Sequence, residues 1–166
     1  MDEQKIKNLI KVWYENKAKR ESDPIFKFLC LWICFNAWLD YRSRKETDRA
    51  MINWLVKQDT ITSDLVREYE NAKRTRSFVN SLKSLVVLSQ KKPIEDSRGK
   101  QLSIIIGDEN DFPNIVNAIY RIRCNLFHGG KTADDARDQK LIESCQRILE
   151  RWIGNLLASW KYKATF

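Results

Sequence analysis

The stretch RIRCNLFHGG, residues 121–130, brings together side chains that could cleave a phosphodiester bond. It contains His128, the only histidine of the chain, whose imidazole could act as a base or an acid near neutral pH. Arginine offers a planar fork of donors to phosphate oxygens, and Asn125 could hold a phosphate oxygen or orient the imidazole. A lone histidine at a helix end is more often a cap or a partner of the helix dipole, so the spacing alone favours that structural role.

A helical wheel predicts how these side chains are arranged. At about 100° per residue, one polar face carries four of them: Asn117, Arg121, Asn125 and His128. Arg123 falls instead within the apolar stripe of the same helix. A guanidinium there must form an ion pair, reach an interface or serve a function, because an unpaired buried charge is costly.

The elements that position this stretch are predicted to be helices throughout. Apolar residues recur with a period near 3.6, and prolines and glycines mark the breaks. The helices are expected over residues 3–20, 24–41, 46–58, 62–72, 75–90, 111–128 and 134–162. Residues 91–110 interrupt the pattern with Pro93, Gly99 and Gly107 around the apolar run LSIII, which predicts an edge strand or a buried loop. We therefore expect one domain, residues 1–166, folded as an all-α up-and-down helical bundle.

Composition agrees with a packed domain and gives it a strong positive charge. Of the 166 residues, 43% are hydrophobic and six are Trp, which is ample for one core. Lysine and arginine number 30 against 22 acidic residues, for a formal net charge of +8. Such a field attracts polyanions, among them nucleic acid, although excess lysine can also serve solubility alone.

Cysteine usage and hydropathy argue against a metal site and against a membrane span. Its four cysteines form no CxxC pair, so we expect them to be reduced and mostly buried, and we assign no metal and no cofactor. The acidic pair Asp134–Asp135 is expected to cap the final helix. The start of the chain is charged throughout, and the apolar run after Phe26 is shorter than the ~18 residues a membrane span needs. We expect a cytoplasmic protein with no membrane partner.

The segment YRIRCNLFHGGK resembles the signature of the HEPN superfamily, all-α proteins whose motif is Arg, four to six residues of any type, and then His. The segment FNAWLDYRS, residues 35–43, is similar to the early helix of bacterial HEPN proteins of the Apea-like kind. This resemblance implies a metal-independent endoribonuclease in which the motifs of two protomers share one cleft. The 2′-hydroxyl would attack the phosphate, leaving a 2′,3′-cyclic phosphate and a 5′-hydroxyl.

The resemblance also assigns residue roles. Arg123, His128 and Asn125 would be catalytic, while Arg121, Asn117 and Lys131 would bind the substrate. Arg123 matches the four-residue spacing and Arg121 the six-residue spacing, and we favour Arg123 because a dimer interface would explain its place on the apolar side. The family usually has a polar residue directly after the motif arginine, where this chain has Cys124. Gly130 occupies the place of a tyrosine that is modified in one toxin branch, so that form of control is not carried over.

Three hypotheses remain open on the sequence. The first is a HEPN-type ribonuclease of bacterial stress response or phage defence, with RNA as substrate, a homodimer as its active form, and an antitoxin or sensor protein as its restraint. The second is a noncatalytic HEPN domain that binds nucleotide, RNA or a protein. The third is a helical interaction module in which His128 only caps a helix.

Overall fold

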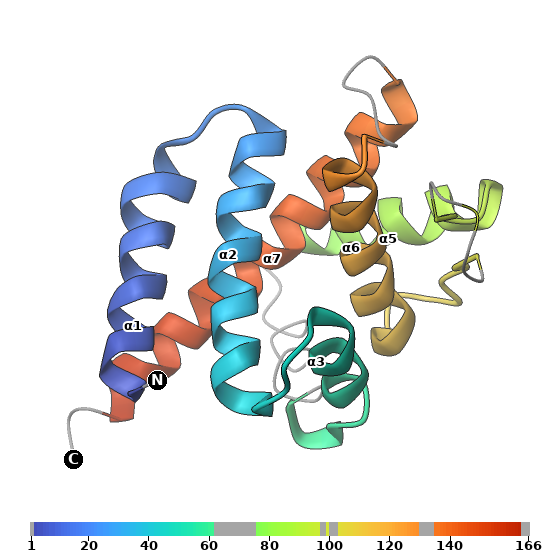
Figure 1. The fold of residues 1–166 in the computed structure, drawn as a ribbon. Helices are drawn as coiled ribbons and strands as arrows, with labels where there is room; N and C mark the ends of the chain where they lie inside the picture. Colours follow the sequence, from blue (N-terminus) through green and yellow to red (C-terminus); the bar gives the residue numbers. More distant parts are fainter. Residues whose placement is uncertain (1, 62–75, 97–98, 100–102, 130–134, 164–166) are drawn as a thin grey trace.

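The computed structural model describes residues 2–61, 76–96, 99, 103–129 and 135–163, and it confirms an all-α helical bundle (Figure 1). The α-helices are α1 (Glu3–Val12), α2 (Pro24–Ser43), α3 (Asp48–Leu55), α5 (Arg76–Lys91), α6 (Phe112–Phe127) and α7 (Ala136–Lys163). The helix expected over 62–72 lies outside the described residues.

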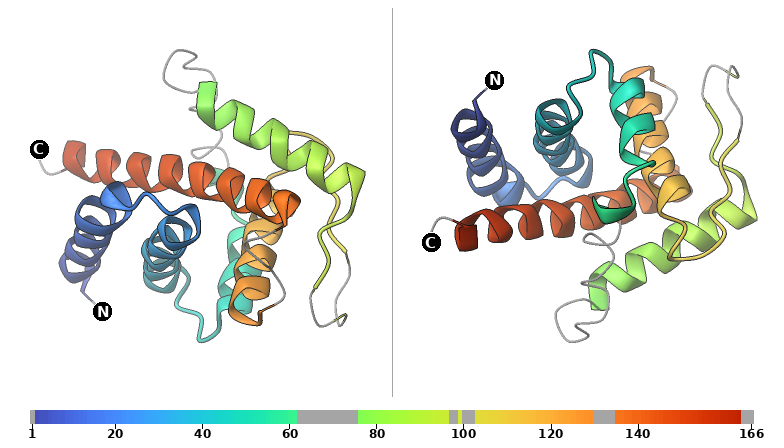
Figure 2. Two further views of the ribbon diagram at one scale, coloured as in Figure 1. Left: turned by 90° about the horizontal axis from the view of Figure 1, so that it is seen from above. Right: turned by 90° about the horizontal axis from the view of Figure 1, so that it is seen from below.

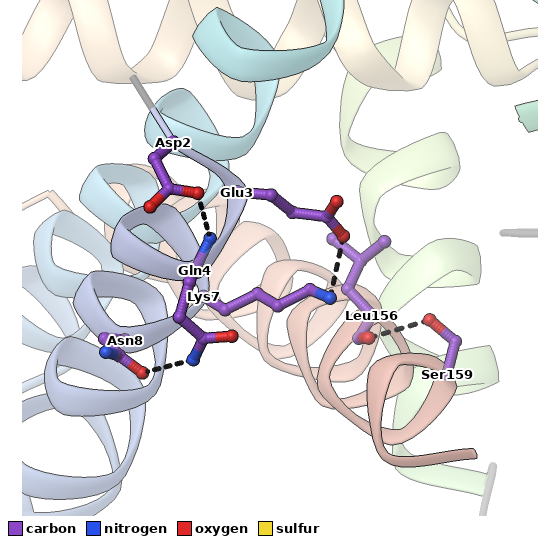
Figure 3. Close-up of polar contacts among 7 residues, drawn as sticks. All are labelled: Asp2, Glu3, Gln4, Lys7, Asn8, Leu156 and Ser159. Atoms are coloured by element: carbon purple, nitrogen blue, oxygen red, sulfur yellow. Dashed lines mark hydrogen bonds and ion pairs between the residues drawn. The ribbon is translucent and has the colours of Figure 1, made fainter. Parts of the chain in front are cut away.

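The first helix is less regular than its sequence predicts. One helix was expected over 3–20, but α1 ends at Val12 and continues as a π-helical turn, Trp13–Lys17, followed by a 3-10 turn, Ala18–Arg20. The start of α1 is capped by Asp2, whose carboxylate accepts a hydrogen bond from the backbone N–H of Gln4 at 3.1 Å (Figure 3). A 2.7 Å ion pair between Lys7 and Glu3 supports the first turn. The irregular part is therefore confined to the end that leads into α2.

Helix α2 carries the broad apolar stripe that the sequence predicts for the centre of the bundle. Asp23 accepts hydrogen bonds from the backbone of Ile25 and Phe26, with Pro24 in the first turn, as expected for a helix start. Its buried apolar side chains are Phe28, Leu31, Trp32, Cys34, Phe35, Trp38 and Leu39. Burying this many large side chains supplies a major part of the hydrophobic stabilisation.

Helix α7 is the axis on which the other helices are arranged. Figure 2 shows α5 on one side of α7 and the helices α1, α2, α3 and α6 on the other, in both views. The most extensive helix contacts are those of α7 with α2 and with α5. Its buried positions Leu141, Cys145, Ile148, Trp152 and Ile153 belong to the single core cluster of the described residues. The long final helix thus joins both layers of the bundle.

The described part of the segment between α5 and α6 is an irregular loop with one isolated bridge. Ile94 and Ile104 exchange backbone hydrogen bonds as an antiparallel pair, and no further pairing extends the bridge within the described residues. Ile104 and Ile106 are buried, whereas Ile105 is 52% exposed. The Ser89 hydroxyl of α5 accepts the N–H of Ile106 at 3.0 Å, which fastens the loop to α5. The expected irregular insertion at 91–110 is therefore present.

The start of α7 is capped as the sequence predicts. The Asp135 carboxylate accepts the backbone N–H groups of Arg137 and Asp138 at 2.8 and 2.9 Å, whereas Asp134 lies outside the described residues. The Arg137 guanidinium donates to the carbonyls of Leu88 and Lys92, which lie at the C-terminal end of α5. A cation at this end offsets the negative pole of the helix dipole and joins the two helices.

The cysteines are free, as expected, with Cys34 and Cys145 buried and Cys30 and Cys124 half-buried. Burial raises the pKa of the Cys34 thiol to about 12, so this thiol stays protonated. No helix in the described part of the chain combines the length and the apolar character needed to cross a membrane.

Candidate functional site at the C-terminal end of helix α6

Helix α6 stops where its glycines predict. Asp111 caps its start, and His128 stands at the C-cap with its backbone N–H bonded to the Cys124 carbonyl at 3.1 Å. Gly129 follows with a φ of +67°, the left-handed conformation that glycine adopts without strain at helix ends. The His128 side chain is exposed, and within the described residues it has no hydrogen bond or ion pair. The imidazole is therefore accessible to a ligand.

Two of the four side chains on the predicted polar face of α6, Arg121 and Asn125, are buried. Arg121 is only 4% exposed and Asn125 only 1%. The Arg121 guanidinium lies 3.9 Å from the carboxylate of Asp96, and the Asn125 amide donates to the carbonyl oxygen of Glu95 at 2.9 Å. The loop between α5 and α6 covers this side of the helix, and both polar side chains hold the loop against α6.

Arg123, which the sequence places within the apolar stripe of α6, is partly exposed and forms an ion pair. Its side chain is 24% exposed, and its Nη2 lies 3.1 Å from a carboxylate oxygen of Asp48 in the first turn of α3. The guanidinium carbon lies 4.5 Å from the ring centre of Phe127 and 5.5 Å from that of Trp32 on α2. The ion pair and the two aromatic rings account for this arginine within one protomer, so its position does not require a dimer interface.

Asn117, another predicted site residue, lies nearer the start of α6 than its C-terminal end. Asn117 is half-buried near the start of α6, where its amide nitrogen donates to the Pro113 carbonyl at 2.8 Å. Its amide oxygen accepts from Arg49 of α3 at 3.5 Å. Lys131 lies outside the described residues.

Tyr120, whose ring lies beside Trp32 as Arg123 does, was not identified from the sequence. Its ring lies 6.0 Å from Trp32, and the Arg49 guanidinium lies 5.1 Å above it. Burial, followed by the nearby Cys124 thiol, raises the pKa of Tyr120 to about 12, so it is a neutral phenol at physiological pH. Asp48 was missed as well, because an acid in the first turn of a helix is ordinarily explained by the helix dipole.

We call Arg123, Phe127 and His128, which are exposed or partly exposed at this end of the helix, the α6 C-terminal surface. Phe127 is 61% exposed, which is unusual for so large an apolar ring. Together they offer an imidazole, a cation for phosphate oxygens and an aromatic face for a nucleobase. No group of three or more His, Cys, Asp or Glu side chains in the described residues is placed to hold a metal ion.

Comparison of the chain with family models, with curated proteins and with solved structures found no match.

Proposed function

We propose that this protein is a metal-independent endoribonuclease of the HEPN type. The observation that carries the proposal is the exposed His128 ring, which bonds to none of the described residues and follows Arg123 by five residues at the same end of α6. Exposure is what a general acid or base needs, since it must reach the substrate proton directly. An imidazole that served only the fold would be expected to bond a neighbouring group.

In the proposed reaction, the 2′-oxygen of a ribose attacks the adjacent phosphorus and the 5′-oxygen of the next nucleotide leaves. The products are a 2′,3′-cyclic phosphate and a 5′-hydroxyl. His128 takes or returns the proton, and Arg123 stabilises the charge on the phosphate oxygens. The exposed ring of Phe127 stacks on a base beside the cleaved bond.

The buried arrangement favours Arg123 over Arg121 as the motif arginine. Arg121 is 4% exposed behind the loop that carries Asp96, so contact with RNA would require that loop to move. Asn125 is buried as well, and in this proposal it holds the last turns of α6 through Glu95 without touching substrate. Asn117 and Lys131 remain proposed contacts to the RNA backbone.

A homodimer would supply a second α6 C-terminal surface and so complete a shared cleft. Large apolar side chains are exposed on α2 as well as at Phe127: Phe26 is 63% and Ile33 is 38% exposed. Exposed apolar groups of this size are suited to a protein interface. We further propose that the enzyme acts in the cytoplasm in bacterial stress response or phage defence, restrained by an antitoxin or sensor protein, and that its net charge of +8 attracts RNA.

The second candidate is a noncatalytic HEPN domain that binds nucleotide, RNA or a protein partner. The 3.1 Å ion pair of Arg123 with Asp48 favours it, because a guanidinium already held by a carboxylate can serve the packing of α3 on α6. The two candidates differ in whether His128 is needed for a chemical step or only ends the helix.

The decisive experiment incubates purified protein in excess EDTA with a pool of single-stranded and structured RNA and maps the chemical nature of the new ends. The wild type is compared with His128→Ala, His128→Gln and Arg123→Ala, and RNA binding is measured for each. We expect cyclic-phosphate ends from the wild type and a loss of at least about a hundredfold in rate for each variant.

Absence of cleavage by the wild type, with RNA bound equally by all four proteins, would overturn the nuclease proposal in favour of the binding domain. Equal cleavage by wild type and His128→Gln would exclude His128 from the chemistry. Thermal unfolding of each variant serves as control, and we expect no loss of stability from His128 substitutions, since that ring is exposed.

A further inference from the structure

A second polar site lies away from α6, between the irregular turn after α1, the start of α5 and the C-terminal half of α7. It is a pocket of about 540 Å³. Its described lining residues are Tyr14, Ser77, Phe78, Arg147, Glu150, Arg151, Gly154, Asn155 and Ala158. Small-molecule sites in proteins typically have volumes of about 300–1,000 Å³, so the pocket is large enough for a metabolite.

The wall of the pocket contains an irregular backbone turn, and a side chain of that turn lies close to the backbone of α7. Tyr14 belongs to the π-helical turn Trp13–Lys17, a kind of irregularity that occurs frequently at functional sites. A Cβ added at Gly154 of α7 would stand 3.1 Å from the Tyr14 hydroxyl oxygen. Glycine at this position therefore lets the phenol lie directly against the α7 backbone.

Asn155 and Tyr14 each offer the lining a hydrogen-bond donor that has no partner in the described part of the chain. The Asn155 amide nitrogen is buried without a hydrogen bond. The Tyr14 hydroxyl likewise bonds to no described residue, and burial, followed by the charge of Glu150, raises the pKa of this phenol, so it remains protonated. Leaving a buried donor unsatisfied costs about 1–3 kcal/mol, a cost that a bound acceptor would remove.

The charge of the pocket favours an anion. Arg147 and Arg151 line it, and the Lys19 ammonium lies 5.0 Å from the centre of the Tyr14 ring. Glu150, the acidic residue among the described lining residues, is paired with Lys27 at 3.0 Å and accepts from Gln146 at 2.8 Å. Within the described lining the cations therefore exceed the acid, and Glu150 is engaged by Lys27 and Gln146.

We propose that this pocket binds a phosphate monoester of a small organic molecule. The phosphate oxygens accept hydrogen bonds from the Asn155 amide, the Tyr14 hydroxyl and the guanidinium of Arg147. A phosphate ion alone is far smaller than the pocket, so an organic portion fills the remainder against the apolar ring of Phe78. None of the lining residues belongs to α6, so binding is independent of His128.

The experiment titrates the intact protein with phenyl phosphate, inorganic phosphate and phenol by isothermal calorimetry at constant ionic strength. We expect phenyl phosphate to bind more tightly than inorganic phosphate, and phenol to bind least. Arg147→Gln and Asn155→Leu should each weaken phenyl phosphate at least about tenfold, while Tyr14→Phe should weaken it several-fold. His128→Ala should bind as wild type does.

The matched control is Lys140→Gln, which removes one exposed charge from the same helix outside the pocket. We expect it to change the affinity less than twofold. Arg147 is itself exposed, so its substitution keeps the fold and the measurement remains decisive even if Asn155→Leu unfolds. Equal weakening by Lys140→Gln and Arg147→Gln, or no binding of phenyl phosphate by wild type, would overturn the proposal.

Discussion

The two sides of helix α6 carry the same kinds of side chain and use them differently. On one side, Arg121 and Asn125 are buried and hold the loop of Glu95 and Asp96. On the other, Arg123 is partly exposed beside aromatic rings, and the helix ends at an exposed His128. Residue type and helical spacing do not distinguish a buried arginine that holds a loop from an arginine that a ligand can reach. The segments that cover each side of the helix lie elsewhere in the chain.

The difference has an energetic meaning that can be tested. A buried pair leaves an uncompensated charge when one partner is removed, whereas a partly exposed pair is largely replaced by water. The buried side should therefore govern stability and the accessible side should govern ligand contact.

The first prediction concerns Arg121. Arg121→Leu should lower the free energy of unfolding by about 3 kcal/mol, because Asp96, whose side chain is only 8% exposed, loses its cationic neighbour. Urea denaturation monitored by tryptophan fluorescence measures the change. The double variant Arg121→Leu with Asp96→Asn should recover part of the loss, and a loss below about 0.5 kcal/mol for the single variant would remove the distinction between the two sides.

The second prediction concerns Asn125. Asn125→Ala should cost about 2 kcal/mol, since the Glu95 carbonyl loses its donor in a buried setting. Asn117→Ala, on the same helix but half-buried, is the matched control and should change stability by no more than about 0.5 kcal/mol. Hydrogen exchange of the backbone amides of Ile94 and Ile104 should increase in Asn125→Ala alone. Equal losses of stability from Asn125→Ala and Asn117→Ala would contradict the role of Asn125 in holding the loop of Glu95.

The third prediction concerns Arg123. Arg123→Gln should reduce stability by less than about 1 kcal/mol, because its ion pair with Asp48 is partly exposed to water. The same urea titration provides the comparison with Arg121→Leu. A loss as large as that of Arg121→Leu would make Arg123 a packing residue and would favour the noncatalytic candidate function.

The fourth prediction concerns pH. The pKa of Tyr120 is raised from its ordinary value of 10.0 to about 12, so the folded state retains a proton that the unfolded chain loses first. Its contribution to stability is therefore present below pH 10 and is lost as the pH rises toward 12. Between pH 10 and 12, the free energy of unfolding of Tyr120→Phe should fall less steeply than that of wild type. At neutral pH the titration of Tyr120 should make no difference between the two proteins. Parallel pH profiles for the two proteins would show that Tyr120 titrates normally.

Much of the helical layout could be predicted from local sequence. Asp23 with Pro24, Asp111 with Pro113, and Gly129 marked helix ends that the structure confirms. Capping side chains and glycine act on neighbouring backbone groups, so their effect depends on a few adjacent residues only. The π-helical turn after Val12 was missed, because the apolar spacing of residues 3–20 continues across it without a break.

The candidate site could be predicted only in part. His128 lies at the end of α6, as the sequence predicts, but the sequence did not show that Arg121 and Asn125 are buried. A helical wheel gives relative direction around one helix and assumes that the polar side faces water. Here a loop outside the helix covers that side, which the wheel does not include.

The sequence by itself determined the helices, their caps, the positive charge and the chemistry available at residues 121–128, because these depend on residue type and near neighbours. The tertiary structure decided which arginine is accessible, that Asp48 pairs with Arg123 across 75 residues, and that Tyr14 meets Gly154 beside a polar pocket. Those outcomes depend on contacts between residues far apart in the chain, whose formation is set by how the whole core packs.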